Sequence, residues 1–230
     1  MTRPPIDNET AGRLLAAAAA LFGERGFDGV SARAVAERAG VNKALVFYYF
    51  GSMEALFGRI VDRYYEAHGA ALRAAAGDDA PLATRLHRMV DAYLDFIDSN
   101  RHYPGLVQSQ LTSHGSEIDA IRRSMAALYE GIAGLLAEVT PADGPLAARH
   151  FFVTFSAAVV NTFTYAPALA GIWAGDPLSV AAIAERRAHL HWLVDTLLGR
   201  LVADAAAREA VPTDRSSTSG ALASSGRDPA

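Results

Sequence analysis

Residues Ser31–Phe50, SARAVAERAGVNKALVFYYF, limit the possible folds of this chain more than any other stretch. Ser31 precedes a short predicted helix, and its hydroxyl can accept a hydrogen bond from a backbone N–H of the first turn. Gly40 permits a sharp reversal of the chain, and Asn42 can cap the helix that follows. With the β-branched Val46 beneath the second helix, this pattern predicts a helix-turn-helix.

The second predicted helix carries side chains that suit DNA. We expect Lys43, Tyr48 and Tyr49 to be exposed. Their ammonium group and phenol hydroxyls can contact phosphates and groove edges. The alternative is that the aromatic run Phe47–Phe50 is simply core. A helix buries only one side of such a run, so we expect Phe50, with Phe47 as a second candidate, to pack inward.

The run from Gly40 to Leu56 resembles the recognition helix, and the start of the next helix, of TetR-family transcriptional regulators. The resemblance covers roughly residues 9–69. It implies an all-α homodimer whose N-terminal domains bind double-stranded operator DNA. It also implies a C-terminal domain whose small-molecule effector releases that DNA, most often in a repressor. The DNA-contact positions carried over from the family, together with the helix cap before them, are Ser31, Arg33, Asn42, Lys43, Ala44, Leu45, Phe47, Tyr48 and Tyr49.

The chain departs from the family pattern at several of these positions. Leu45 replaces a residue that is usually polar, although an apolar side chain can still contact a thymine methyl group. Phe47 stands where a Tyr is common, and Met53 stands where a Lys beside a phosphate is usual. The motif is therefore retained, with two phosphate contacts altered.

Composition limits the other possibilities. The 230 residues include no cysteine, which excludes disulfides, thiolate metal sites and cysteine nucleophiles. The formal net charge is −4, while residues 1–56 carry six Arg or Lys and six Asp or Glu. A neutral DNA-binding end on an acidic body predicts modest, salt-sensitive affinity for DNA, provided that the positive charges share one face.

Two apolar stretches raise the question of a membrane. Leu14–Phe22 is similar to the core of a signal peptide, but Asp7 and Glu9 stand where a basic region is expected. Residues 151–175 are uncharged and long enough to span a bilayer, yet they include hydroxyl and amide side chains and Pro167. We therefore expect a core or dimer helix here, no membrane segment, and a cytoplasmic protein.

Helical periodicity predicts an all-α fold with about nine helices and the following organisation. The expected units are a flexible arm (1–7), a helix-turn-helix DNA-binding domain (8–52), a helical effector-binding and dimerisation domain (53–205) and a disordered tail (206–230). A long helix over 52–76 joins the two domains, and Pro104 interrupts the chain before a short helix at 107–111. The last two long helices have wide apolar stripes that we expect to form a seam between two copies, including Ile183, Leu190, Leu193, Val194 and Leu197.

Aromatic and polar residues on the middle helices are candidates for the effector pocket, with ordinary core packing as the alternative for each. Together they favour a hydrophobic or aromatic effector. The candidates are Tyr93, Phe96, His102, Tyr103, Gln110, His114, Tyr129, Phe152, Phe155 and Trp173.

No feature of the sequence predicts a cofactor or a metal site. His189 and His191 are two residues apart on a predicted helix, so they point to different faces. The competing function is a small all-helical enzyme or ligand-binding protein without a DNA role. Against an enzyme, the sequence has no Gly-x-Ser-x-Gly elbow, no phosphate-binding glycine loop before a lysine, no HExxH and no paired-carboxylate motif.

Overall fold

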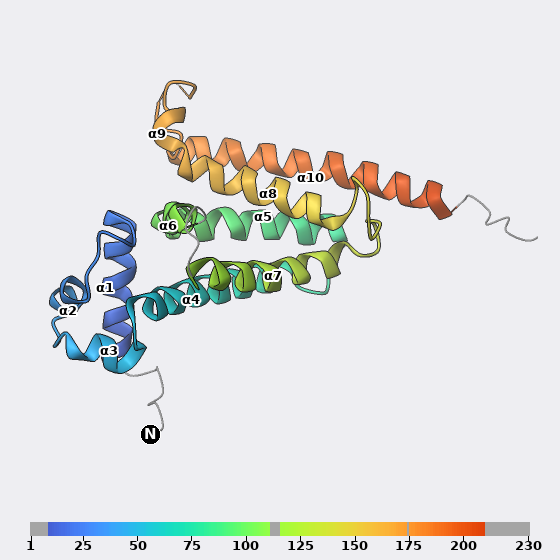
Figure 1. Cartoon of the computed structure of the whole chain (residues 1–230). Coiled ribbons are helices and arrows are strands. Elements are labelled where there is room, and N and C mark those ends of the chain that lie inside the picture. Colours follow the sequence, from blue (N-terminus) through green and yellow to red (C-terminus); the bar gives the residue numbers. More distant parts are fainter. Residues whose placement is uncertain (1–8, 111–115, 174, 210–230) are drawn as a thin grey trace, which may run out of the picture.

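The computed structural model describes residues 9–110, 116–173 and 175–209, and this part of the chain is helical without strands, which confirms the all-α prediction. A small head at one end precedes a body of longer helices (Figure 1). The head contains α1 (Glu9–Arg25), α2 (Ala32–Ala39) and α3 (Ala44–Phe50). The body contains α4 (Met53–Ala76), α5 (Leu82–Ser99), α6 (His102–Gln110), α7 (Ser116–Leu136), α8 (Ala148–Thr164), α9 (Ala166–Leu169) and α10 (Val180–Glu209).

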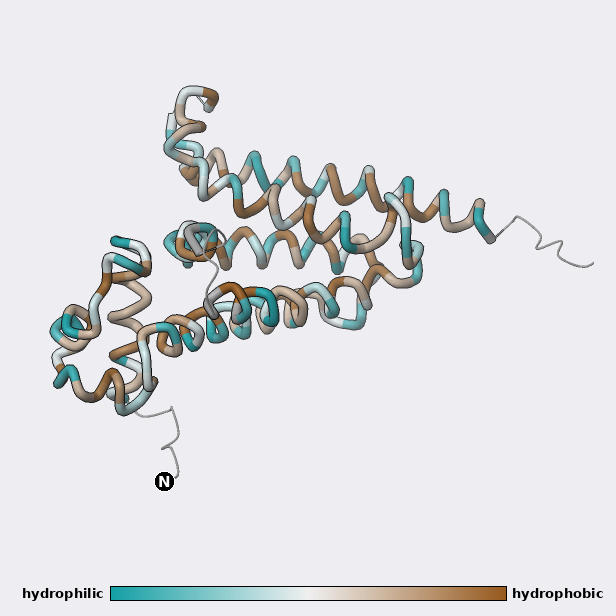
Figure 2. The backbone as a smooth tube through the Cα atoms, viewed as in Figure 1, coloured by the Kyte–Doolittle hydropathy of each residue, from teal (hydrophilic) through white to brown (hydrophobic). Residues whose placement is uncertain are grey.

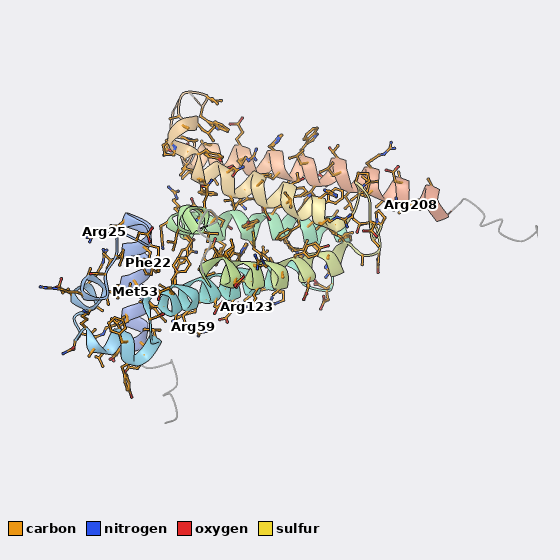
Figure 3. The ribbon with its side chains drawn as sticks, in the orientation of Figure 1. Phe22, Arg25, Met53, Arg59, Arg123 and Arg208 are labelled. Atoms are coloured by element: carbon orange, nitrogen blue, oxygen red, sulfur yellow. The ribbon has the colours of Figure 1, made fainter. Side chains whose placement is uncertain are left out.

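Three aromatic rings form the centre of the head. Phe22 on α1 lies 5.4 Å from Phe27 and 5.7 Å from Phe57, measured between ring centroids, and Phe22 is labelled in Figure 3. Phe57 belongs to the second turn of α4 and is completely buried. Burial of rings of this size contributes much of the stability of a small core. The helix that leads into the body is therefore also part of the core of the head.

The body is layered, with α5 lying between the pair α4 and α7 and the pair α8 and α10 (Figure 1). Apolar and hydrophilic residues alternate along these helices, as expected for helices that each bury one face (Figure 2). On α4 the buried residues run from Leu56 through Ile60 and Tyr64 to Leu72. This spacing agrees with the long helix predicted over 52–76.

Two short helices, α6 and α9, each contain a proline. Pro104 lies in the first turn of α6, which begins at His102 rather than at the predicted residue 107. Pro167 lies in the first turn of α9. Proline is compatible with a first turn, because the N–H groups there have no partner within the helix. Both prolines are therefore compatible with the helices that contain them.

The apolar stripe of α10 faces its own chain. Ile183, Leu190 and Val194 are buried in the described structure, where α10 packs on α5. Arg187 and His191 fix this packing, with Arg187 Nη1 and His191 Nε2 lying 2.8 and 2.7 Å from Asp91 Oδ1. Of the five residues predicted for a seam between two copies, Ile183, Leu190 and Val194 are therefore already covered within the chain, whereas Leu193 and Leu197 are half-buried. Exposed large apolar side chains on α8 and α10 are instead Val153, Val180, Trp192 and Val202.

The ends of the chain are described only in part. The predicted arm, residues 1–7, lies outside the described residues, as does the tail from residue 210 onward. Helix α10 continues to Glu209, beyond the predicted end of the body at residue 205. Within the described ranges, no single helix has the length and hydrophobicity that a bilayer span requires. Helices α3 and α4 meet that requirement only when taken together, across a bend of 59°.

Candidate nucleic-acid interface

Short-range hydrogen bonds build the turn between α2 and α3. Ser31 Oγ accepts a bond from Ala34 N at 3.2 Å at the start of α2. Gly40 has φ of 65°, a left-handed conformation that costs little without a Cβ atom. Asn42 Oδ1 accepts a bond from Ala44 N at 2.8 Å at the start of α3. These contacts confirm the predicted caps and the predicted helix-turn-helix.

Helix α3 buries one face and exposes the other. Val46, Tyr49 and Phe50 are buried, at positions three and four residues apart. The opposite face carries Lys43, Ala44, Phe47 and Tyr48, and we call these four residues the α3 face. The side chain of Phe47 is 45% exposed and that of Tyr48 is 61% exposed.

Two of the exposure predictions for α3 were wrong. Tyr49 was expected to be exposed, but it is only 8% exposed, and Phe47 was considered for the core but lies outside. The reason is the helical period: Tyr49 follows Val46 by three residues and so shares its buried side, whereas Phe47 does not. Tyr49 packs edge-on against Tyr48, with ring centroids 5.1 Å apart, and so supports the exposed ring.

The α3 face combines one cation, one phenol and apolar surface. Lys43 Nζ lies 6.0 Å from the centroid of the Phe47 ring, close enough for a weak cation–π contact. An ammonium group can bind a phosphate, a phenol can hydrogen-bond to a phosphate or a base edge, and Ala44 can contact a thymine methyl group. Such a face is chemically suited to the major groove of DNA.

The other predicted contact residues have partners within the head. Arg33 Nε lies 2.7 Å from Glu37 Oε1 on the exposed side of α2, and this hydrogen bond raises the pKa of Arg33. Ser31 and Asn42 use their side-chain oxygens as caps, and Leu45 is half-buried against the core. Arg33 must share or leave Glu37 before it can bind a phosphate.

Met53 lies at the junction of head and body, where the family pattern has a lysine (Figure 3). It is half-buried and packs against the core, while Ser52 caps α4 by accepting a bond from Ala55 N at 3.0 Å. The side chain of Met53 therefore serves packing in this chain.

Some predicted effector residues line two neighbouring cavities in the body. The apolar cavity, of about 90 Å³, is lined by Tyr93, Phe152 and Phe155 together with aliphatic side chains such as Val194. The His68 cavity, of about 210 Å³, is lined by Tyr93 and Phe152 as well as by residues of α4, α6 and α7. Tyr93, Phe152 and Ser156 line both cavities, so the two adjoin.

The remaining predicted effector residues whose side chains the structure describes do not line these cavities, although three of them contact residues that do. Phe96 stacks on His68 at 4.9 Å, Tyr103 stacks on Tyr64 at 4.4 Å, and Tyr129 packs edge-on against Phe152 at 5.6 Å between centroids. His102 lies instead beside Gly23 of α1. Trp173 lies beyond α9 and lines neither cavity, and the side chains of Gln110 and His114 are outside the described residues.

Sequence reasoning missed His68 and its neighbour Tyr65. His68 is 1% exposed, and burial lowers its pKa to about 4. Burial also raises the pKa of Tyr65 to about 12. The available clue was the spacing of Tyr64 and His68, four residues apart on the apolar side of the predicted helix over 52–76.

Comparisons with known proteins agree with this architecture. Residues 14–60 match the family model described as bacterial regulatory proteins, tetR family. The chain is 32% identical over 96 residues to the HTH-type transcriptional activator FasR of Mycolicibacterium smegmatis, covering 42% of this chain and 43% of FasR. It is 30% identical over 159 residues to the HTH-type transcriptional repressor Rv3405c of Mycobacterium tuberculosis, covering 64% of this chain and 73% of Rv3405c.

The chain spans only about half the length of the relatives that match first, 51% and 43%. Among solved structures, the transcriptional regulator FadR from Bacillus subtilis in complex with stearoyl-CoA is similar, with a TM-score of 0.62 and 15% identity. That similarity covers 84% of this chain and 97% of FadR, and at this identity it supports the fold alone. The match of 30% identity over most of Rv3405c, with the family model across the helix-turn-helix, shows that the chain belongs to the TetR family of bacterial regulatory proteins.

Proposed function

We propose that this protein is a sequence-specific DNA-binding transcriptional regulator, acting as a cytoplasmic homodimer. The observation that carries the proposal is the α3 face, where Lys43, Phe47 and Tyr48 are exposed on a helix whose other side is buried. Side chains of this kind have no role in the core of the head. We assign the direct contacts to the α3 face, with Arg33 and Asn42 beside it and Tyr49 supporting Tyr48.

The proposed dimer uses the outer sides of α8 and α10. Val153 is 64% exposed and Trp192 is 59% exposed, and large exposed apolar side chains favour an interface. In a two-fold dimer the two α3 helices would bind successive major grooves, about 34–36 Å or a multiple of that distance apart.

The proposed regulation is release of the operator by a hydrophobic small molecule bound in the body. The two cavities provide mainly apolar walls with a few polar groups, as ligand pockets commonly do. An effector that favours a different spacing of the two heads would couple the sites by about 1–3 kcal/mol. FasR is named an activator and Rv3405c a repressor, and we propose repression as the mode of this chain.

The test is a fluorescence-anisotropy titration of the protein with DNA flanking its own gene and with duplexes selected from a random pool. We expect tight binding that weakens steeply with salt. We predict that Lys43→Ala weakens specific binding by about 1–3 kcal/mol without changing the fold. A matched control is Arg122→Ala, which removes an exposed cation from α7, far from the α3 face.

Unchanged affinity in Lys43→Ala would contradict the assignment of that contact. Failure to enrich any duplex from the random pool would contradict the DNA-binding proposal as a whole. In that case the cavities favour the competing function, a small helical ligand-binding protein or enzyme without a DNA role.

A further inference from the structure

The His68 cavity contains a polar group without a hydrogen-bond partner among the described residues. It lies among α4, α5, α6, α7 and α8 and has a volume of about 210 Å³. His68 lines it and is 1% exposed, and neither Nδ1 nor Nε2 has a hydrogen-bond partner within residues 9–110, 116–173 and 175–209. A buried polar group left without a partner is destabilising, so this imidazole is expected to form a hydrogen bond with water or with a ligand.

Neighbouring rings hold the His68 side chain in place. The Phe96 ring stacks on the imidazole at 4.9 Å with an interplanar angle of 10°, and the Tyr93 ring lies 4.4 Å away. Burial raises the pKa of the Tyr93 hydroxyl, and the neighbouring Ser156 side chain partly opposes that rise. The imidazole is therefore packed against two rings and shielded from solvent.

The His68 cavity is lined by polar and apolar side chains but by no charged one among the described residues. None of the described side chains that line it is an Asp, Glu, Lys or Arg. Burial lowers the pKa of His68 to about 4, so near pH 7 its ring is neutral, with one N–H donor and one nitrogen acceptor. A charged ligand buried here would lose its hydration without gaining an opposite charge, which is costly.

The apolar cavity extends this site. It shares Tyr93, Phe152 and Ser156 with the His68 cavity, and most of its remaining lining is aliphatic or aromatic. Together the two cavities offer a hydrogen-bonding end and an apolar continuation.

We propose that the His68 cavity binds an uncharged, mainly apolar molecule with one hydroxyl-bearing end of the phenol or alcohol type, which forms a hydrogen bond with the His68 ring. The apolar part of the ligand packs against Phe152 and Leu128 and extends toward the apolar cavity. The assignment of this ligand as the effector rests on the proposed function, whereas its binding does not require DNA.

The experiment is calorimetry on the full chain, without DNA, using probes of matched shape. The aromatic set is 4-propylphenol, propylbenzene and 4-propylbenzoate, and the aliphatic set is 1-octanol and octanoate. We expect one of the hydroxyl probes to bind, about 3–10-fold tighter than its apolar analogue where one exists, and at least about tenfold tighter than its carboxylate. The ¹⁵N chemical shifts of the His68 ring should change on binding.

The variants separate the hydrogen bond from packing. We expect His68→Phe to bind 4-propylphenol no more tightly than propylbenzene. His68→Gln keeps a donor and an acceptor, so it should bind 4-propylphenol more tightly than propylbenzene, by a smaller factor than the unmodified chain. His150→Phe is the matched control, because His150 is exposed on α8 and lines neither cavity. Should a variant fail to fold, the comparison of probes on the unmodified chain still decides the question.

Three results would overturn the proposal. Equal affinity for 4-propylphenol and propylbenzene would mean that ordered water alone hydrogen-bonds to His68. If a carboxylate probe binds more tightly than the matching hydroxyl probe, the site is one for anions. If neither 4-propylphenol nor 1-octanol binds, the cavity is a closed part of the core. Probe binding that leaves the protein–DNA complex intact would instead contradict the effector role and leave the site itself supported.

Discussion

At the scale of the single residue, His68 destabilises the ligand-free protein and can hydrogen-bond to a ligand. Its ring is buried, stacked against Phe96 and without a hydrogen-bond partner in the part of the chain that the structure describes. We predict that His68→Phe raises the free energy of unfolding of the ligand-free protein at pH 7 by about 1–2 kcal/mol, because it removes an unsatisfied polar group. Urea denaturation followed by circular dichroism measures the change.

The same variant tests how the free energy of unfolding depends on pH. The pKa of His68 is lowered from 6.5 to about 4 in the folded chain, so below pH 6.5 the unfolded chain binds a proton that the folded chain does not. The free energy of unfolding of the unmodified chain should therefore fall as pH falls. Relative to that of His68→Phe, it should be lower by about 1 kcal/mol at pH 5.5 and by about 3 kcal/mol at pH 4 than near pH 7. Parallel pH profiles of the two proteins would contradict this, and His150→Phe should follow the unmodified chain.

At the scale of the element, α1 contains two glycines in different surroundings. A Cβ atom at Gly12 would meet nothing within 4 Å, whereas at Gly23 it would lie 3.0 Å from the Cβ atom of His102 on α6. Alanine is favoured over glycine inside a helix by about 0.8–1.0 kcal/mol. We predict that Gly12→Ala raises the free energy of unfolding by about 0.5–1 kcal/mol, while Gly23→Ala gives no gain or a loss.

Chemical denaturation of the two variants side by side tests this prediction. An equal gain in both would mean that α6 moves away from α1 without cost, so that the contact of Gly23 with His102 does not join head and body firmly. A loss in Gly12→Ala would instead show a contact that the structure does not contain.

At the scale of the whole molecule, the proposed dimer interface on the outer sides of α8 and α10 can be tested by substitution. Trp192 on α10 is 59% exposed and stacks only loosely on His189, with ring centroids 5.7 Å apart. We predict that Trp192→Glu raises the dimer dissociation constant at least about 30-fold, because interface tryptophans commonly contribute about 2 kcal/mol or more. Sedimentation velocity across a concentration series measures the change.

Phe47→Glu is the matched control for assembly. It replaces another exposed aromatic side chain by the same acid, but on the α3 face. This variant should remain dimeric while losing DNA affinity, since a carboxylate beside phosphates is repelled. A dimer that tolerates Trp192→Glu would place the interface on another surface.

The local structure of the head was predictable from the sequence alone. The caps made by Ser31, Asn42 and Ser52 each join atoms within three residues of one another, and the left-handed turn at Gly40 depends on its own missing Cβ atom. Such interactions depend on neighbours along the chain, so the residue types and their spacing are sufficient to predict them. The helix-turn-helix, the resemblance to the family and the all-α class follow from this level.

Tertiary structure decided which faces and which cavities exist. The helical period places Phe47 and Tyr49 on different sides of α3, and the packing of α3 in the head decides which side is buried. Ile183, Leu190 and Val194 of α10 are covered because α5 lies beneath them. The His68 cavity joins residues of α4 with residues of α8 that are distant in sequence. Sequence periodicity shows that a helix has an apolar side, but only the packing of distant helices determines what covers that side and where a space remains.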